Sequence, residues 1–541
     1  MDEIITSLGV GPATYLYFAV ASLGPVSQVV NLMGSQFISP PVQFTCLDLH
    51  QSDVIVTNTS ECVVASAGGE SNETRSCKLY QFSHEIYHFT LTEEFELVCS
   101  KAYVREIFQM MFTIGCVVGC LVGGLLADKL GRQPTVWYGS ALVAFFTTLL
   151  VAIPNLTSIL VCRFFIGFFT MFITSPVYII GLEFCPMPLR STYGVCVSLP
   201  WAIMISLLAG LGYACPDWRT FQLAGSFPTV LLLLLSNHLL LKESPRWLVS
   251  RGRLKEAEAS LLRVAKWNKT TYNWPDNLMG VLEGIYAKNC EEKQSSTFLS
   301  RFKSLVSSPY LRRVTSILLP MWLMQGCLYI SIPLSADQFP SPYVFMAVLG
   351  VAEIPAYSVA APITARLGRK KFLIGGLLLA CALQITVVVL TVTGYGNYWL
   401  QILLVALGYT IICSVYQVNL LFCGELFPTS IRTLGTSLSV LTYSAGEIIP
   451  PLLKIVLPAG LSWLPLTIYA ILAGLAAFLI LLLPETNNKP LLQTLGSTQV
   501  HSSEKDIFVT KPRYDSVQKN LGGIPLSTTG QEKMTAEDRQ D

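Results

Sequence analysis

The sequence predicts an all-α membrane protein in which twelve transmembrane helices form two pseudo-symmetric six-helix halves. Of its 541 residues, 52% are hydrophobic and only 13% are charged, whereas charged residues make up about 25% of a soluble globular protein. The charges gather in clusters, and the apolar runs between them are about 20 residues long, the length of helix that crosses a bilayer. Motifs at the ends of these runs recur 242 residues apart, which indicates that one half repeats the other.

Long unbroken apolar runs favour helical spans, because a transmembrane barrel would show short segments of alternating hydrophobicity. The twelve expected spans are 13–37, 103–127, 134–153, 157–181, 194–214, 221–241, 312–334, 342–363, 372–393, 398–422, 434–457 and 461–483. Of the 36 Lys and Arg residues, 29 fall in segments that lie inside if the N-terminus is cytoplasmic. The positive-inside rule therefore predicts that both termini are cytoplasmic.

With this orientation, residues 39–101 form a large first extracellular loop. The cysteines of this loop are Cys46, Cys62, Cys77 and Cys99. An even number outside the cell is consistent with two disulfides, and the sequence leaves three pairings open. Two Asn-X-Ser/Thr tripeptides begin in the same loop at Asn58 and Asn72, and we expect glycosylation at both.

The two halves share motifs at the ends that we expect to face the cytoplasm. GLEFCPMPLRSTYG begins at Gly181 and CGELFPTSIRTLG at Cys423, and in both motifs an Arg follows a Glu by seven residues. KESPRWL after the sixth span corresponds to PETNNKPL after the twelfth, and GGLLADKLGRQ after the second to APITARLGRKK after the eighth. We therefore divide the chain into a first half (1–241), a charged helical linker (242–311), a second half (312–483) and a disordered tail (484–541). Two halves of six spans each, with related motifs at their cytoplasmic corners, are typical of major facilitator transporters.

Seven motifs in order carry a resemblance to one branch of those transporters. They are ADKLGR, RFFIGF, DWRTFQLAGSFP, ESPRWL, EIPAY, ELFPTSIR and LLLPET. Together with the large cysteine-bearing loop, they resemble the organic cation, anion and zwitterion (carnitine) transporter family over about residues 10–490. Sugar porters share several corners, but their first outer loop is short, and they carry a Gln-Gln-Leu-Ser-like stretch where this chain reads MQGCLYIS.

Charged residues gather at the corners, where the resemblance implies an inner gate whose salt bridges close one state and separate in the other. The gate candidates are Asp128, Arg132, Glu183, Arg190, Glu243, Arg369, Glu425, Arg432 and Glu485. Partly exposed pairs worth about 1 kcal/mol suit such a switch. The alternative is that these residues only set topology and cap helices. We favour the gate, because the repeat preserves the signs of the charges at both corners.

The substrate site is expected between the halves, near the bilayer midplane. The candidates are the four ionisable residues that we expect to be buried within the spans: Arg163, Glu353, Glu447 and Lys454. Lys454 lies near the outer end of its span, where we expect its ammonium group to reach the surface. Arg163 and Glu353 belong to motifs general in the family, and for these two we favour internal pairing over substrate contact.

The eleventh span decides the expected charge of the substrate. At the position of Ser444, the family resemblance implies an aspartate in cation carriers and an arginine in anion and carnitine carriers, and this chain has neither. Glu447 lies one turn further along the same helix face, so we expect it to supply the missing carboxylate. Pro450 and Pro451 leave the carbonyls of Gly446 and Glu447 without their helical donors, and a broken helix at membrane depth indicates a cavity or a protein-buried site.

Aromatic side chains complete the candidate substrate site. The resemblance matches the cage aromatics of the family to Tyr178 and Tyr329, and Trp201 stands where the family often has Phe. The alternative for each ring is simple packing. The candidate substrate-binding set is Glu447, Ser444, Tyr329, Tyr178, Trp201 and Glu353.

The predicted function is that of a multi-pass plasma-membrane carrier, not an enzyme. We expect it to move small organic cations or zwitterions, such as amines and carnitine-like betaines, by alternating access. The alternatives are an organic anion transporter and a receptor that keeps the fold without transporting. We expect no cofactor, because the sequence has no P-loop and no metal-spaced His/Cys cluster. The net charge of +2 predicts no nucleic acid partner, so the expected partners are the bilayer and a small organic ion.

Overall fold

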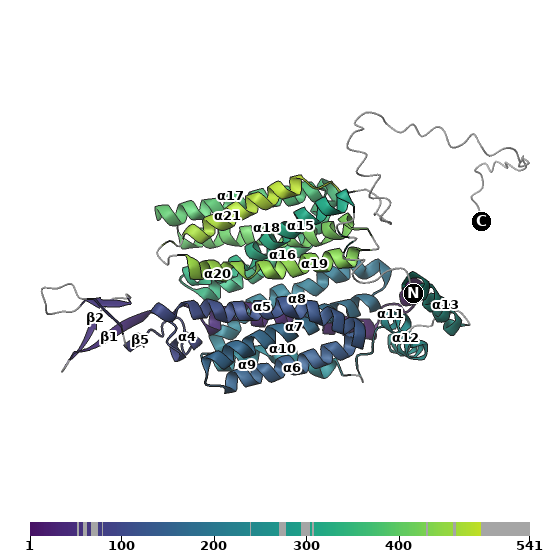
Figure 1. Cartoon of the computed structure of the whole chain (residues 1–541), viewed down its shortest axis with the longest axis horizontal. Coiled ribbons are helices and arrows are strands. Elements are labelled where there is room, and N and C mark those ends of the chain that lie inside the picture. Colours follow the sequence, from purple (N-terminus) through teal and green to yellow (C-terminus); the bar gives the residue numbers. More distant parts are fainter. Residues whose placement is uncertain are drawn as a thin grey trace, which may run out of the picture.

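The computed structural model is a bundle of long helices, with short strands at one end and three short helices at the other (Figure 1). It describes residues 1–50, 53–57, 62–65, 74–77, 79–237, 240–269, 277–293, 303, 305, 308–395, 397–428, 431–457, 461 and 463–487. We call the end with the strands the strand end. The opposite end, which holds the charged corner residues, we call the charged end.

The first half is built from long helices, whose bounds lie close to the expected spans, and from several short helices between them. They are α1 (Asp2–Ser7), α2 (Pro12–Met33), α3 (Ser35–Ile38), α4 (Leu91–Glu94), η1 (Cys99–Lys101), α5 (Tyr103–Leu130), α6 (Arg132–Ala152), α7 (Leu156–Phe184), η2 (Met187–Leu189), α8 (Arg190–Ala214), α9 (Trp218–Gly225) and α10 (Phe227–Leu235). Helices α5 and α6 meet at Gly131, whose φ of 114° is a conformation that residues with a side chain rarely adopt.

The second half repeats this arrangement. Its elements are α15 (Pro309–Ser331), η3 (Pro333–Gln338), α16 (Pro342–Leu367), α17 (Arg369–Thr393), α18 (Tyr398–Leu426), α19 (Arg432–Gly446), α20 (Ile449–Val456) and α21 (Trp463–Leu481). Helices α16 and α17 meet at Gly368, which has a φ of 87° and stands in the same LGR motif as Gly131. The sequence repeat predicted related corners in the two halves, and the backbone makes the same kind of turn at both, between α5 and α6 and between α16 and α17.

Ten helices in the described residues are long and apolar enough to cross a membrane. The remaining two expected spans, 221–241 and 434–457, are each broken into two shorter helices. The first break lies at Ser226, between α9 and α10, and the second at Glu447 and Ile448, between α19 and α20. Proline follows each break within a few residues, and it removes a backbone donor that a continuous helix would need.

The linker packs on the first half. It forms α11 (Pro245–Ser250), α12 (Leu254–Asn268) and α13 (Leu278–Lys293). Asn268 is buried, and its amide group accepts a hydrogen bond from the N–H of Ala13 at 3.0 Å and donates to the carbonyl of Leu8 at 3.2 Å. The indole of Trp247 donates to the carbonyl of Asp128 at 2.8 Å. These bonds join the linker to α2 and to the end of α5.

The segment after α3 departs from the all-α prediction, because it contains five short strands. They are β1 (Phe44–His50), β2 (Asp53–Thr57), β3 (Val63–Ala65), β4 (Thr74–Ser76) and β5 (Leu79–Phe82). One antiparallel sheet has the order β2-β1-β5, and β3 pairs with β4. Composition and span counting did not detect these strands, because each is short and lies outside the apolar runs.

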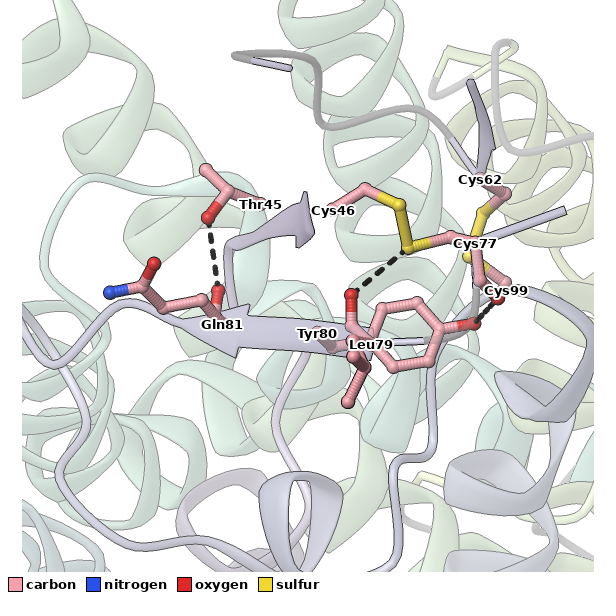
Figure 2. Close-up of a disulfide and its surroundings, with 8 residues drawn as sticks. All are labelled: Thr45, Cys46, Cys62, Cys77, Leu79, Tyr80, Gln81 and Cys99. Carbon is pink, nitrogen blue, oxygen red and sulfur yellow. Dashed lines mark hydrogen bonds between the residues drawn. A yellow bond between two sulfur atoms is a disulfide. The ribbon is translucent and has the colours of Figure 1, made fainter. Parts of the chain in front are cut away.

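Two disulfides cross-link this segment (Figure 2). Cys46 is bonded to Cys77 and Cys62 to Cys99, with Cα atoms 5.8 and 5.5 Å apart. Of the three pairings that the sequence left open, the structure has this one. The second disulfide ties the strands to η1, just before α5. Both tripeptide asparagines, Asn58 and Asn72, lie outside the described residues.

In the second half, α15 and α19 approach each other closely, and this contact positions Glu447. A Cβ atom added at Gly326 would lie 2.0 Å from the carbonyl oxygen of Tyr443, and one added at Gly446 would lie 2.0 Å from that of Leu323. Small residues at such crossings are typical of membrane helix packing. The crossing holds the last turn of α19, and with it Glu447, against the core.

Candidate functional site

The charged end holds the predicted gate residues, and among the described residues their ion pairs each stay within one half. In the first half, Arg132 lies 3.3 Å from Glu183 and 3.8 Å from Asp128. In the second half, Arg369 lies 3.2 Å from Glu425. The structure thus pairs Arg132 and Arg369 with expected acids of their own corners, and no ion pair among the described residues joins the two corners.

Glu243 and Glu485 each accept hydrogen bonds from backbone N–H groups at the start of a helix. Glu243 accepts a hydrogen bond from the backbone N–H of Gln133 at 3.1 Å, at the start of α6. Glu485 accepts from the N–H groups of Arg369 and Lys370 at 3.2 and 3.1 Å, at the start of α17. A carboxylate is stabilised at a helix N-terminus by these free donors. Burial raises the pKa of Glu243, against the effect of its hydrogen bonds.

Arg190 has a partner that sequence reasoning missed. Its guanidinium donates to the carboxylate of Asp2, and Arg246 of the linker donates to the same oxygen. Asp2 is held there because Ile4 and Ile5 of α1 are buried. Arg432, the counterpart of Arg190 in the repeat, differs: its buried Nε and Nη2 atoms have no hydrogen-bond partner in the part of the chain that the structure describes.

A cluster of tyrosines encloses Glu353 in the second half. Its carboxylate is fully buried and accepts hydrogen bonds from Tyr329 at 3.1 Å, from Tyr409 at 3.2 Å and from Tyr357. The expected internal pairing of Glu353 therefore involves hydroxyl groups and not a cation. Tyr357 lies four residues after Glu353 on the same helix, so its helical spacing could have indicated it. Tyr409 comes from α18, and no local signal links it to Glu353.

Trp201 joins this cluster from the other half. Its indole N–H donates to the hydroxyl of Tyr329 at 2.7 Å. Two further bonds connect α8 to the second half, from Gln417 to Ser198 at 3.2 Å and from Ser206 to the carbonyl of Ala347 at 3.2 Å. Of the aromatic candidates, Trp201 and Tyr329 thus lie together between the halves. Tyr178 packs instead on Tyr193, with ring centroids 6.0 Å apart.

Glu447 lies at the break between α19 and α20 and is 4% exposed. Its carboxylate makes no hydrogen bond or ion pair with any residue that the structure describes. Ser444, one turn earlier, is also buried. Aromatic rings surround the preceding turn, because Tyr443 lies 6.1 Å from Trp322, 5.0 Å from Tyr416 and 6.4 Å from Tyr329 between ring centroids.

The other two of the four candidate ionisable residues, Arg163 and Lys454, have partners of their own. Arg163 donates to the backbone carbonyl and side chain of Asn31, and its guanidinium carbon lies 4.5 and 4.9 Å from the ring centroids of Phe108 and Phe112. In the described part of the chain, Arg163 forms no ion pair with Glu447. Lys454 forms an ion pair with Asp337 at 3.0 Å at the strand end, so the expectation that its ammonium group only reaches the surface was incomplete.

These features define a class of protein. Two related bundles of apolar helices, joined by a linker and enclosing buried polar groups between them, form the fold of major facilitator carriers. The fold is similar to that of the proton:xylose symporter XylE bound to 6-bromo-6-deoxy-D-glucose, with a TM-score of 0.58 and 16% identity over 92% of this chain and 99% of that one. It is also similar to the inward open conformation of XylE from E. coli, with a TM-score of 0.59, 15% identity, and coverage of 92% and 98%.

The chain belongs to the family described as "Sugar (and other) transporter", whose model matches residues 70–494. It is 30% identical to an organic cation transporter protein of Drosophila melanogaster, over 91% of this chain and 93% of the relative. It is 27% identical to solute carrier family 22 member 2 of Mus musculus, over 92% and 86%, and 30% identical to organic anion transporter 3 of Oryctolagus cuniculus, over 82% and 79%. The protein is therefore a membrane carrier and not an enzyme, and the resemblance inferred from its motifs is confirmed.

Proposed function

We propose that the protein carries small organic cations or zwitterions, such as amines and carnitine-like betaines, across the plasma membrane. The observation that carries this proposal is Glu447, a buried carboxylate without a partner among the described residues, beside a break between two helices. An acid is retained at membrane depth, at a cost of several kcal/mol, where it meets a cavity or a ligand. A cationic group that donates charge-assisted hydrogen bonds is the natural partner for it. The organic cation transporter among the relatives supports the same substrate class.

The proposed substrate site lies between the halves. Glu447 and Ser444 form one side of it, and Trp201, Tyr329 and Glu353 lie on the side where α8 meets α15. Tyr178 contributes nearer the charged end. Aromatic rings suit organic cations because the face of a ring carries negative charge density. The same rings tolerate substrates of different shape, which fits a polyspecific carrier.

Transport proceeds by alternating access in this proposal. All twelve predicted spans cross the membrane, both termini and the charged end lie in the cytoplasm, and residues 39–101 lie outside, where Asn58 and Asn72 carry glycans. Residues 1–241 and 312–483 form the moving halves. The linker 242–311 moves with the first half, as its hydrogen bonds to α2 and α5 support. At the start of the tail (484–541), Glu485 is bound to the first residues of α17, and residues 488–541 lie outside the described part of the chain. When the charged end closes, the corner arginines and acids exchange partners across the halves.

Two other functions are compatible with particular features of the chain. Ser444 is neutral, and relatives include an organic anion transporter, so transport of organic anions is the second candidate. A receptor that keeps the fold without transporting is the third, but a static receptor would not need the charges of the corners.

Uptake into liposomes that contain the purified protein distinguishes these functions. The panel is radiolabelled tetraethylammonium, carnitine and p-aminohippurate, and protein-free liposomes are the control. We expect saturable uptake of the cation or the betaine. Uptake of the anion alone would assign the second function, and specific binding without uptake of any of the three would assign the third.

A further inference from the structure

The hydrogen bonds around Tyr329 have a fixed direction. An indole nitrogen is a donor only, so Trp201 donates and the Tyr329 oxygen accepts, at 2.7 Å. A tyrosine hydroxyl has one proton, which is then free to donate elsewhere. The acceptor within reach is Oε1 of Glu353, at 3.1 Å. Trp201 therefore orients the Tyr329 hydroxyl toward Glu353.

In this arrangement, both carboxylate oxygens of Glu353 accept hydrogen bonds from tyrosine hydroxyl groups. Tyr329 and Tyr357 donate to one of its oxygens, and Tyr409 donates to the other at 3.2 Å. The carboxylate has no exposed surface. An ionised carboxylate is held by such donors in place of water. Its charge is thus satisfied inside the second half, and a substrate meets it only if a tyrosine turns away.

Glu447 differs in both respects. No donor of the described residues satisfies its carboxylate, which lies at the break between α19 and α20. Of the two buried glutamates, one is therefore committed to protein hydroxyls and the other is available.

We propose that Trp201 is a specificity-determining residue that acts through Tyr329: it keeps Glu353 bound to its tyrosines, so that the site offers a substrate one carboxylate and selects monovalent over divalent organic cations. This inference rests on the proposed function, because it takes Glu447 as the substrate carboxylate. Phe at this position has no N–H, so the Tyr329 hydroxyl would lose the donor that orients it.

The test compares Trp201→Phe, Tyr329→Phe and the double variant with the wild type. Purified proteins are titrated with tetraethylammonium and with bis-trimethylammonium alkanes of increasing chain length, and binding is measured by equilibrium competition against a labelled monovalent cation. We expect each single variant to improve the affinity for the best dication relative to the monocation by about tenfold, the size of one hydrogen bond to a charged group. The double variant should not exceed Tyr329→Phe, because Trp201 acts through Tyr329.

Trp399→Phe is the matched control, because Trp399 is 51% exposed on α18 and should leave the ratio unchanged. A thermal unfolding cycle of the same four proteins reports separately whether Trp201 and Tyr329 are coupled. A wild type that binds the monocation, with an unchanged ratio in both single variants, would overturn this inference alone. A wild type that binds neither kind of ion would overturn the proposed function and this inference with it.

Discussion

Arg190 and Arg432 occupy equivalent corners, 242 residues apart, but only the first is held by a carboxylate in the described part of the chain. Arg190 is bound to Asp2, whereas the buried Nε and Nη2 atoms of Arg432 have no hydrogen-bond partner there. A buried donor without a partner costs about 1–3 kcal/mol. This cost is acceptable in a carrier if Arg432 gains a partner in another state of the transport cycle.

The first prediction concerns these two arginines. Arg432→Ala and Arg190→Ala should each lower the uptake rate about fivefold or more at equal surface expression, because loss of about 1 kcal/mol shifts the balance of states by that factor. Arg366→Ala is the control, since Arg366 is exposed at the end of α16. Surface biotinylation normalises the uptake. Normal uptake by both variants at normal surface levels would contradict the gate.

The second prediction concerns Asp2 and pH. Burial opposes ionisation of Asp2, but hydrogen bonds from Arg190 and Arg246 and the charges of both arginines lower its pKa below the ordinary value near 4. A lowered pKa gives stability that is present above the ordinary pKa and is lost as pH falls through the folded pKa. Asp2→Asn should therefore destabilise the protein at neutral pH by at most about 1 kcal/mol, because the pair is partly exposed.

The measurement is thermal unfolding in detergent across pH. The difference between wild type and Asp2→Asn should be constant from pH 6 to 8, begin to shrink near pH 4, and disappear only once the pH is below the folded pKa of Asp2. Glu3→Gln is the neighbouring control, because Glu3 is exposed, and it should behave as wild type. An equal loss of stability in Glu3→Gln would show that Asp2 has no special partner.

The sequence predicted the parts of the fold that depend on periodic patterns. The lengths of the apolar runs predicted the spans. The repeated LGR motif predicted the related corners, which the structure forms at Gly131 and Gly368. The contacts of Asp2 with Arg190 and of Tyr409 with Glu353 could not be predicted, because they join residues 188 and 56 positions apart with no shared motif. The strands after α3 were missed for the same reason, since pairing and disulfides rather than local hydrophobicity define them.

The third prediction concerns the two disulfides. Cys46–Cys77 and Cys62–Cys99 close loops with sequence separations of 31 and 37 residues, and a cross-link of this size stabilises a fold by about 3–4 kcal/mol in the chain-entropy model. Removing both partners of one disulfide should lower surface delivery. Non-reducing peptide mapping by mass spectrometry should find Cys46 linked to Cys77. Finding Cys46 linked to Cys62 or Cys99 would refute the pairing.

The fourth prediction concerns glycosylation of the same segment. Treatment of surface protein with an N-glycosidase should lower its apparent mass, and the variant with Asn58→Gln and Asn72→Gln together should already run at the lower mass. A further tripeptide, Asn155-Leu156-Thr157, stands at the start of α7, where Asn155 caps the helix, and we expect it to lie too close to the membrane for modification. Thr157→Val removes this tripeptide. That control should leave the shift intact. A wild type whose mass does not change would remove the main support for placing residues 39–101 outside.

The fifth prediction concerns Glu447. Glu447→Gln keeps the shape of the side chain and removes its charge, so it should weaken cation binding by about 1–3 kcal/mol, or roughly five- to 150-fold in apparent affinity. Adding Ser444→Asp restores a carboxylate one turn earlier on the same face, where the side chain is also buried, and should recover part of the loss. Competition binding with tetraethylammonium measures both variants.

The competing account holds that Glu447 is an internal partner of Arg163. It expects Glu447→Gln to fold poorly and a change at Arg163 to repair it. The structure does not favour this account, because Arg163 is bound to Asn31 and stacked on Phe108 and Phe112. Fluorescence size-exclusion profiles separate the two accounts, since our proposal expects Glu447→Gln to be monodisperse and well expressed. A well-expressed Glu447→Gln carrier with unchanged cation affinity would end the idea that Glu447 binds the substrate.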